Sequence, residues 1–271
     1  MAFLIFSRPP RIALLRLSGL IAARQPGFGA PGISAATTGP LITRAFGLKR
    51  LAGVVLVINS PGGSPVQSSL VAAQIRRLAD EKKVPVIACV EDAAASGGYW
   101  LACAADEIVA DASSILGSIG VISAGFGLEE AIGKLGVQRR LHTAGEQKSF
   151  LDPFGPERPE DVERLRGLLG QLHTTFQDHV RTRRGAKLRA PEAELFTGRF
   201  WAGTKAVELG LADRLGDAAT EIKNRWGEKA RVITIGERRP PWPLRLLSGA
   251  TLAEGALAAV EERAAWARLG L

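Results

Sequence analysis

The sequence predicts an α/β protein built on a largely parallel sheet. Two apolar runs, at residues 54–58 and 84–90, are continuous rather than alternating, which is typical of strands that are buried on both faces of a parallel sheet. Between them, residues 67–82 repeat apolar side chains at helical spacing. Strand and helix therefore alternate along the chain, which is the order of an α/β fold.

The remaining elements extend this alternation in both directions. The pattern predicts further strands at 11–19, 108–110, 120–123 and 137–143, and further helices at 40–49, 96–104, 128–135, 159–184, 202–209 and 252–269. We expect three parts: an N-terminal segment at 1–10, a catalytic domain at 11–223, and a tail at 224–271 that holds a strand and an amphipathic helix. The stretch at 25–39 is rich in Gly, Pro, Ser and Thr and is interpreted as a loop.

The composition of the chain limits which partners, disulfides and cofactors we expect. The 271 residues carry a net charge of +8, but the arginines are scattered and no aromatic-basic alternation marks a nucleic-acid module. Cys89 and Cys103 lie in apolar runs, which predicts two buried thiols, no disulfide framework and a reducing compartment. No phosphate-binding loop or cluster of metal ligands occurs, so we expect no cofactor and no metal.

Segments near the two ends of the chain are the candidates for membrane contact. Apolar runs at residues 1–6 and 12–23 are too short for a signal peptide core or a membrane span, so we expect a cytoplasmic protein, with peripheral contact at the inner face of the membrane left open. The tail helix carries an apolar stripe, which predicts packing on the protein or on lipid. The side chains of Glu254, Glu261 and Glu262 favour packing on the protein, because anionic lipid repels carboxylates.

Three segments carry candidate chemistry. Gly62 and Gly63 directly follow a buried strand, and adjacent glycines let backbone N–H groups approach a ligand closely. Ser96 lies between small residues just before an apolar helix, a place that suits either a helix cap or a nucleophile. Lys148 lies in a loop followed by apolar and aromatic residues, and a lysine acts as a base only when desolvation keeps it neutral.

Four motifs, in this order and at this spacing, resemble the short form of the signal peptide peptidase A (SppA) family of serine peptidases. They are Asn59-Ser60-Pro61-Gly62-Gly63, Ala95-Ser96-Gly97-Gly98-Tyr99, Gly117-Ser118-Ile119-Gly120-Val121, and the lysine of Gly145-Glu146-Gln147-Lys148-Ser149. The resemblance covers roughly residues 11–223.

This resemblance implies a Clp-protease/crotonase-like fold of stacked ββα units and a Ser–Lys dyad, one of the convergent variants of the catalytic triad. Ser96 would then be the nucleophile and Lys148 the general base. The N–H groups of Gly63 and Gly97 would hold the oxyanion, and Ser118 would orient the lysine. It also implies a homo-oligomer in which neighbouring protomers complete each site, and peptide substrates such as signal peptide remnants or other unfolded, hydrophobic chains.

Other functions fit the motifs less well. A Ser–His–Asp triad lacks a suitable histidine: His173 and His179 are six residues apart on one predicted helix, and His142 belongs to no triad spacing. A crotonase-like acyl-CoA enzyme shares the fold but has no need of Ser96 and Lys148. A non-catalytic, membrane-associated peptide-binding scaffold is the alternative from a different class.

Overall fold

A computed structural model describes residues 9–23, 32–145, 147–236, 260 and 262–271. By their internal contacts these residues divide into two compact units. The first unit comprises Met1–Ile119 and Gln177–Leu271, and the second comprises Gly120–Phe176. Each unit is described separately below.

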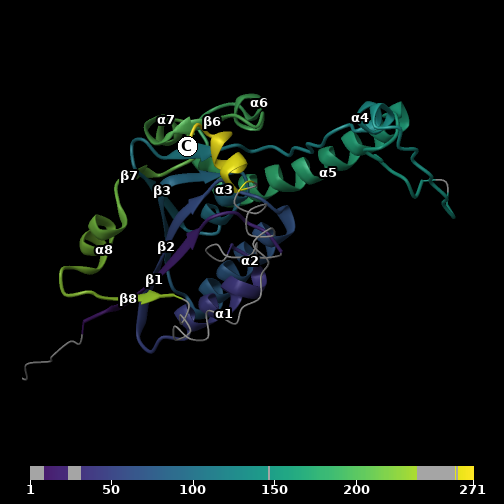
Figure 1. The fold of residues 1–271 in the computed structure, drawn as a ribbon. Coiled ribbons are helices and arrows are strands. Elements are labelled where there is room, and N and C mark those ends of the chain that lie inside the picture. The colour runs from purple at the N-terminus through teal and green to yellow at the C-terminus, as the bar shows by residue number, and fades with distance from the viewer. Residues whose placement is uncertain (1–8, 24–31, 146, 237–259, 261) are drawn as a thin grey trace, which may run out of the picture. The chain divides into compact units, whose positions relative to one another are not determined.

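The described strands of the first unit form one eight-stranded sheet (Figure 1). Its order is β6-β5-β3-β2-β1-β8, with β4 pairing with β3 and β7 pairing with β4. Every pairing is parallel except that of β5 with β6, which confirms the predicted α/β class. The strands are β1 (Arg11–Ser18), β2 (Leu51–Ser60), β3 (Val86–Ala95), β4 (Glu107–Ala110), β5 (Ile115–Gly117), β6 (Phe200–Ala202), β7 (Arg214–Leu215) and β8 (Arg231–Ile235).

The described residues also form helices, of which Glu129–Lys134 and most of Pro159–Arg184 belong to the second unit. They are α1 (Ala35–Phe46), α2 (Pro65–Lys82), α3 (Gly97–Ala102), α4 (Glu129–Lys134), α5 (Pro159–Arg184), the 3₁₀ turn η1 (Gly185–Lys187), α6 (Glu192–Leu195), α7 (Gly203–Glu208) and α8 (Ala218–Trp226). Figure 1 shows α1 and α2 on one side of the sheet and α8 on the other.

The core explains the continuous apolar runs. Residues 53–58 of β2 are all buried, because the sheet has helices on both faces. On the α8 side, Ile222 packs into a cluster with alternate residues of the strands, including Val55 and Cys89. Both cysteines are buried free thiols, as predicted, and burial raises the pKa of each to about 12.

The start of α1 differs from the prediction. The helix begins at Ala35, inside the stretch interpreted as a loop, and ends at Phe46. Ser34 caps it by accepting a hydrogen bond from the Thr37 N–H at 3.2 Å, and the Thr37 hydroxyl accepts one from the Ser34 N–H at 3.1 Å. This reciprocal cap uses threonine where Glu or Gln is the usual signal, and Pro40 lies within the helix instead of at its start.

Two predicted strands are wrong. Residues 120–123 and 137–143 form no strand, and both runs belong to the second unit. Ile122 and Val137 there are 70 % and 53 % exposed. A short apolar run becomes a strand only where a neighbouring strand and a face to bury are available, and neither is present at these residues. The long helix α5 does have the predicted bounds, 159–184.

The tail continues the first unit. β8 adds to the sheet beside β1, with Arg11 opposite Arg231. Residues 262–267 are helical, whereas most of the predicted helix at 252–269 lies outside the described residues. None of the helices in the described part of the chain has the length and apolar character that crossing a bilayer requires.

Candidate active site

Ser96 lies at a sharp turn between a strand and a helix. β3 ends at Ala95 and α3 begins at Gly97, so a single residue joins the two elements. Ser96 has φ 50° and ψ −119°, a conformation that a residue with a Cβ atom rarely adopts. Such strain costs on the order of 1–3 kcal/mol and collects at functional sites. Although Ala94 breaks the Gly-x-Ser-x-Gly pattern, the backbone makes the same kind of strand-to-helix turn that exposes a nucleophilic serine.

The neighbouring strand holds this turn in place. The Ser96 N–H donates to the Gly117 carbonyl at 2.8 Å, and Ala95 pairs with Gly117 in the parallel β3–β5 ladder. Ser118, the next residue, is half-buried, has φ 53°, and donates its N–H to the Arg199 carbonyl at 2.7 Å. The structure therefore places Ser118 one residue beyond the backbone partner of Ser96.

The glycine loop after β2 lies directly against the serine turn. A Cβ atom on Gly62 would be 2.8 Å from the Ser96 Cβ, and a Cβ atom on Gly97 would be 3.3 Å from the Gly63 nitrogen. Among the described residues, the N–H groups of Gly63 and Gly97 have no hydrogen-bond acceptor. Two unpaired donors therefore lie close together beside the Ser96 turn.

Lys148 belongs to the second unit. It lies in a turn, its N–H donates to the Gly145 carbonyl at 3.2 Å, and its side chain is exposed. Close by in the sequence, the Arg164 guanidinium lies over the Phe150 ring, 5.2 Å from the ring centroid. The chain by itself thus leaves this lysine without the burial that keeps an amine neutral.

His142 and His179 differ in their surroundings. His142 is exposed in the second unit, whereas His179 packs behind the helix that follows the serine. The His179 ring stacks on Trp100 with ring centroids 4.6 Å apart, and its Nε2 lies 3.1 Å from the Trp100 carbonyl. Burial lowers the pKa of His179 to about 4, and Arg183 acts in the same direction. His179 is a packing residue, as its helical position predicted.

Stability should therefore depend on pH through His179. Its pKa is lower in the folded chain than the ordinary value of about 6.5, so protons bind the unfolded chain more tightly. We expect this stabilisation to be complete above pH 6.5 and to be lost as the pH falls toward 4, by up to about 3 kcal/mol. Urea unfolding of His179→Gln between pH 4 and 7 should show a flatter profile than the wild type.

The exposed His142 provides the control for this prediction. His142→Gln should keep the wild-type dependence of unfolding free energy on pH, because the His142 side chain is exposed in the folded chain. A His179→Gln profile as steep as that of the wild type would show that another group is responsible.

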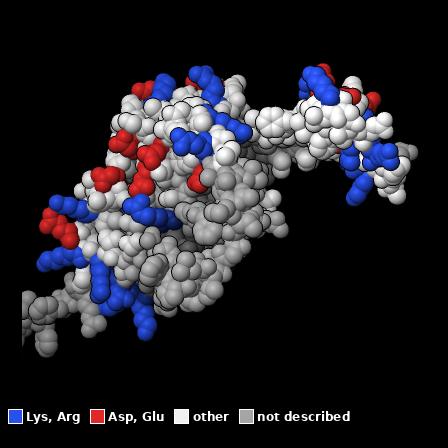
Figure 2. Space-filling model, viewed as in Figure 1, with Lys and Arg blue, Asp and Glu red and all other residues white. Residues whose placement is uncertain are grey.

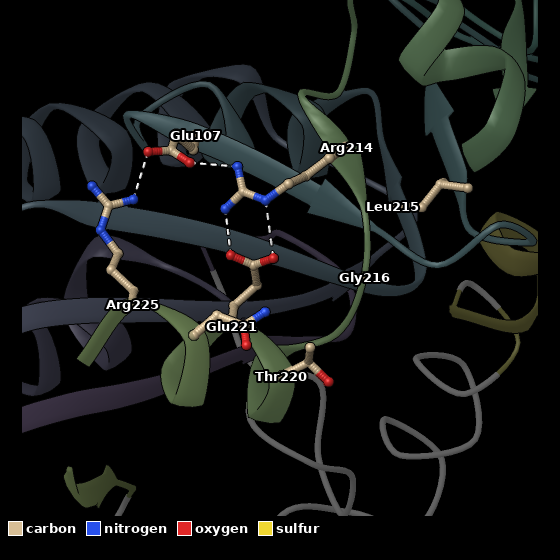
Figure 3. A pocket seen from close by; sticks show the side chains of 8 residues that line it. Glu107, Arg214, Leu215, Gly216, Thr220, Glu221 and Arg225 are labelled. Carbon is tan, nitrogen blue, oxygen red and sulfur yellow. Dashed lines mark hydrogen bonds and ion pairs between the residues drawn. The ribbon is translucent and has the colours of Figure 1, made fainter. Parts of the chain in front are cut away.

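A pocket of about 470 Å³ lies elsewhere in the first unit, between β4, β7 and α8 (Figure 3). The Arg214 guanidinium donates to Glu221, which is largely buried, and to Glu107, which also accepts from Arg225. These ion pairs lower the pKa of Glu107, the hydrogen bond from Arg225 contributing most. Figure 2 shows that acidic and basic side chains lie next to one another on this part of the surface.

This pocket is separate from the serine turn. Glu107 begins β4 opposite Ile87 of β3, whereas Ser96 follows the other end of β3, nine residues further along the chain. Its charges already compensate one another, and the network fastens α8 to the sheet. The serine turn and the glycine loop are therefore the candidate active site.

The motifs left one part of this site unassigned. Ser60 is fully buried, and its hydroxyl donates to the Gly19 carbonyl at 2.7 Å and accepts from the Gly62 N–H at 3.2 Å. Ile21 is also buried, and its backbone pairs with the glycine loop. Gly19 at the end of the first apolar run was the available signal, because it marks where the chain leaves the strand.

Comparisons with known proteins identify a family and several relatives of this chain. The model of Peptidase family S49 matches residues 78–232. The chloroplastic serine protease SPPA of Arabidopsis thaliana is 33% identical over 216 residues, which cover 78% of this chain and 31% of that protein. A Brucella melitensis protein named Na(+)/H(+) antiporter NhaA is 44% identical over 273 residues, 96% of this chain and 37% of that protein.

Solved structures support the fold. The 1510-N membrane-bound stomatin-specific protease has a TM-score of 0.53 and 14% identity, and the match covers 85% of this chain and 99% of that one. This likeness fits the predicted Clp-protease/crotonase-like fold. The chain spans about a third of the length of the Brucella and Arabidopsis relatives, so it matches one part of each. On the family match and these relatives, the chain belongs to peptidase family S49 and is similar to its SppA-named members.

Proposed function

We propose that the chain is a serine endopeptidase in which Ser96 is the nucleophile and Lys148 the general base. The observation that carries the proposal is the strained strand-to-helix turn at Ser96, packed against Gly62 and beside two unpaired N–H groups. A strained turn of this kind persists only where the surrounding structure holds it, and it exposes the hydroxyl for attack.

The reaction assigns a role to each residue. The Ser96 Oγ attacks the peptide carbonyl carbon while neutral Lys148 takes its proton. The Gly63 and Gly97 N–H groups donate to the oxyanion, and Ser118 aims the lysine by hydrogen bonding. Lys148 then protonates the leaving amine, and a water molecule that it deprotonates hydrolyses the acyl-enzyme.

The substrates we propose are extended, unfolded peptides with small or hydrophobic side chains, including remnants of signal peptides and of membrane proteins. Small residues surround Ser96, so a chain must enter in extended form. The name of one relative supports the membrane origin, since it is a putative signal peptide peptidase of Enterococcus faecium. We also propose a cytoplasmic location, with any membrane contact peripheral.

We propose further that a second copy of the chain completes the site. Lys148 is exposed, and the second unit also exposes large apolar side chains such as Phe126 (86 %) and Leu135 (78 %). A neighbouring protomer that covers this surface would exclude water from the lysine amine, as a general base of this kind requires. Sedimentation at assay concentrations tests this: a monomer with full activity would contradict it.

The experiment that tests the function combines a covalent probe with defined substrates. A fluorophosphonate should label wild-type Ser96, and an unfolded hydrophobic peptide should be cleaved while a tightly folded, loop-poor protein should survive. Thioester turnover without labelling would indicate the crotonase-like alternative. Peptide binding without cleavage would indicate a scaffold, and rapid digestion of the folded protein would refute the substrate class.

A further inference from the structure

Residues 20–22 run beside the glycine loop, and Ile21 forms isolated β-bridges there. The Ile21 N–H donates to the Gly62 carbonyl at 2.8 Å, and the Ser64 N–H donates to the Ile21 carbonyl at 2.7 Å, which forms a parallel bridge between Ile21 and Gly63. On the far side, Ile33 is bonded to the same segment through the Leu20 carbonyl and the Ala22 N–H, each at 3.0 Å. Ile21 is therefore the middle residue of a three-stranded ladder.

These bonds set the direction of the Gly63 N–H group. The peptide bond between Gly62 and Gly63 is trans, so its carbonyl and its N–H point in opposite directions. Because the carbonyl faces Ile21, the N–H faces away from Ile21. The Gly63 nitrogen lies 3.3 Å from the position that a Cβ atom on Gly97 would occupy, so the two glycines are in close contact.

The Ile21 side chain reaches the second donor. It is 1 % exposed, and its Cδ1 lies 3.1 Å from the position that a Cβ atom on Gly97 would occupy. The backbone of Ile21 thus holds the loop that carries the Gly63 N–H, while the side chain of Ile21 packs against Gly97.

We propose that Ile21 is a positioning residue that holds the Gly63 and Gly97 N–H groups at the spacing an oxyanion requires. This role rests on the proposed function, since it matters only if these groups act as oxyanion donors. Ile21 touches no reacting atom and acts through the two glycines. Preorganised donors stabilise a developing charge without rearranging during the reaction, so loosening the ladder should weaken binding of the transition state more than binding of the substrate.

Comparing Ser64→Pro with Ser64→Ala separates the effect of opening the ladder from the effect of losing the serine hydroxyl. Ser64 has φ −57°, which proline can adopt, but proline has no N–H, and its ring would occupy the space next to the Ile21 carbonyl. Both variants lose the hydroxyl that caps α2, and only Ser64→Pro opens the ladder. We expect kcat of Ser64→Pro to be about 10- to 100-fold below that of Ser64→Ala, with KM within about twofold. Affinity for a peptide boronate, which forms a tetrahedral adduct, should fall by the same factor as kcat.

A second pair keeps the proposal testable if Ser64→Pro does not fold. Ile21→Ala and Ile33→Ala each remove a buried side chain from the same ladder, so both should lose about 2–5 kcal/mol of stability. Only Ile21→Ala should lower kcat, and Ile21→Leu should restore most of it. Equal kcat values within each pair would overturn the positioning role. The proposed function is judged separately, on the activity of the wild type beside Ser96→Ala.

Discussion

Ser96→Ala is expected to lower kcat/KM for peptide hydrolysis by about 10,000-fold or more, and Lys148→Ala is expected to have a comparable effect. Each substitution removes one partner of the proton transfer and so abolishes the catalytic effect of the pair. A second substitution in the same protein can therefore lower the activity little further. The double variant should therefore be about as active as either single variant. The measurement is kcat/KM on an unfolded apolar peptide for all four proteins.

Two exposed residues supply matched controls for the dyad. Ser113→Ala and Lys134→Ala remove a hydroxyl and an ammonium group from exposed positions, and both should keep wild-type activity. Losses that multiply in the Ser96/Lys148 double variant would show that the two residues act independently and would refute the dyad.

Backbone strain at Ser96 predicts a difference in stability between two inactive variants. Ser96→Gly should also be inactive, yet it should unfold at a higher free energy than Ser96→Ala, because glycine adopts φ 50° without a steric penalty. Urea unfolding of the two inactive variants measures this difference, expected at about 1 kcal/mol. Equal stability would mean that the turn stores no strain.

The sequence predicted those parts of the molecule whose signals are local. The continuous apolar runs at 54–58 and 84–90 identified the central strands, and the helical spacing at 159–184 identified α5 with its observed bounds. The parallel order of the sheet followed from strand–helix alternation. The two wrong strands fell in the second unit, where apolar residues are exposed and periodicity alone says nothing about the presence of a partner strand.

The site required information that no local pattern contains. The motifs named Gly62, Gly63 and Ser96, but their contact depends on the register of β2 against β3, which is set across the sheet. The positive φ of Ser96 is imposed by packing, since serine does not prefer it. Ile21 belonged to an apolar run, and its side chain has no polar atom to mark a role.

Gly63→Ala is expected to lower kcat by about 100- to 1,000-fold, the usual effect of losing one oxyanion donor. Gly63 has φ 139°, where a side chain is strained, and an added Cβ would lie 2.1 Å from the Ile21 carbonyl oxygen, which belongs to the backbone and cannot rotate away. The loop must therefore move, and the Gly63 N–H moves with it. The affinity of a peptide boronate and kcat should fall together, while KM changes little.

Gly167→Ala is the control that separates this effect from a general intolerance of alanine. Gly167 lies within α5, and an added Cβ there would meet no atom within 4 Å. Alanine at this helical position should leave kcat unchanged and stabilise the fold by about 0.5–1 kcal/mol. Because Gly63→Ala also strains the fold, its kcat must be measured well below its melting temperature. A folded Gly63→Ala protein with wild-type kcat would show that the oxyanion is held by groups other than the Gly63 N–H.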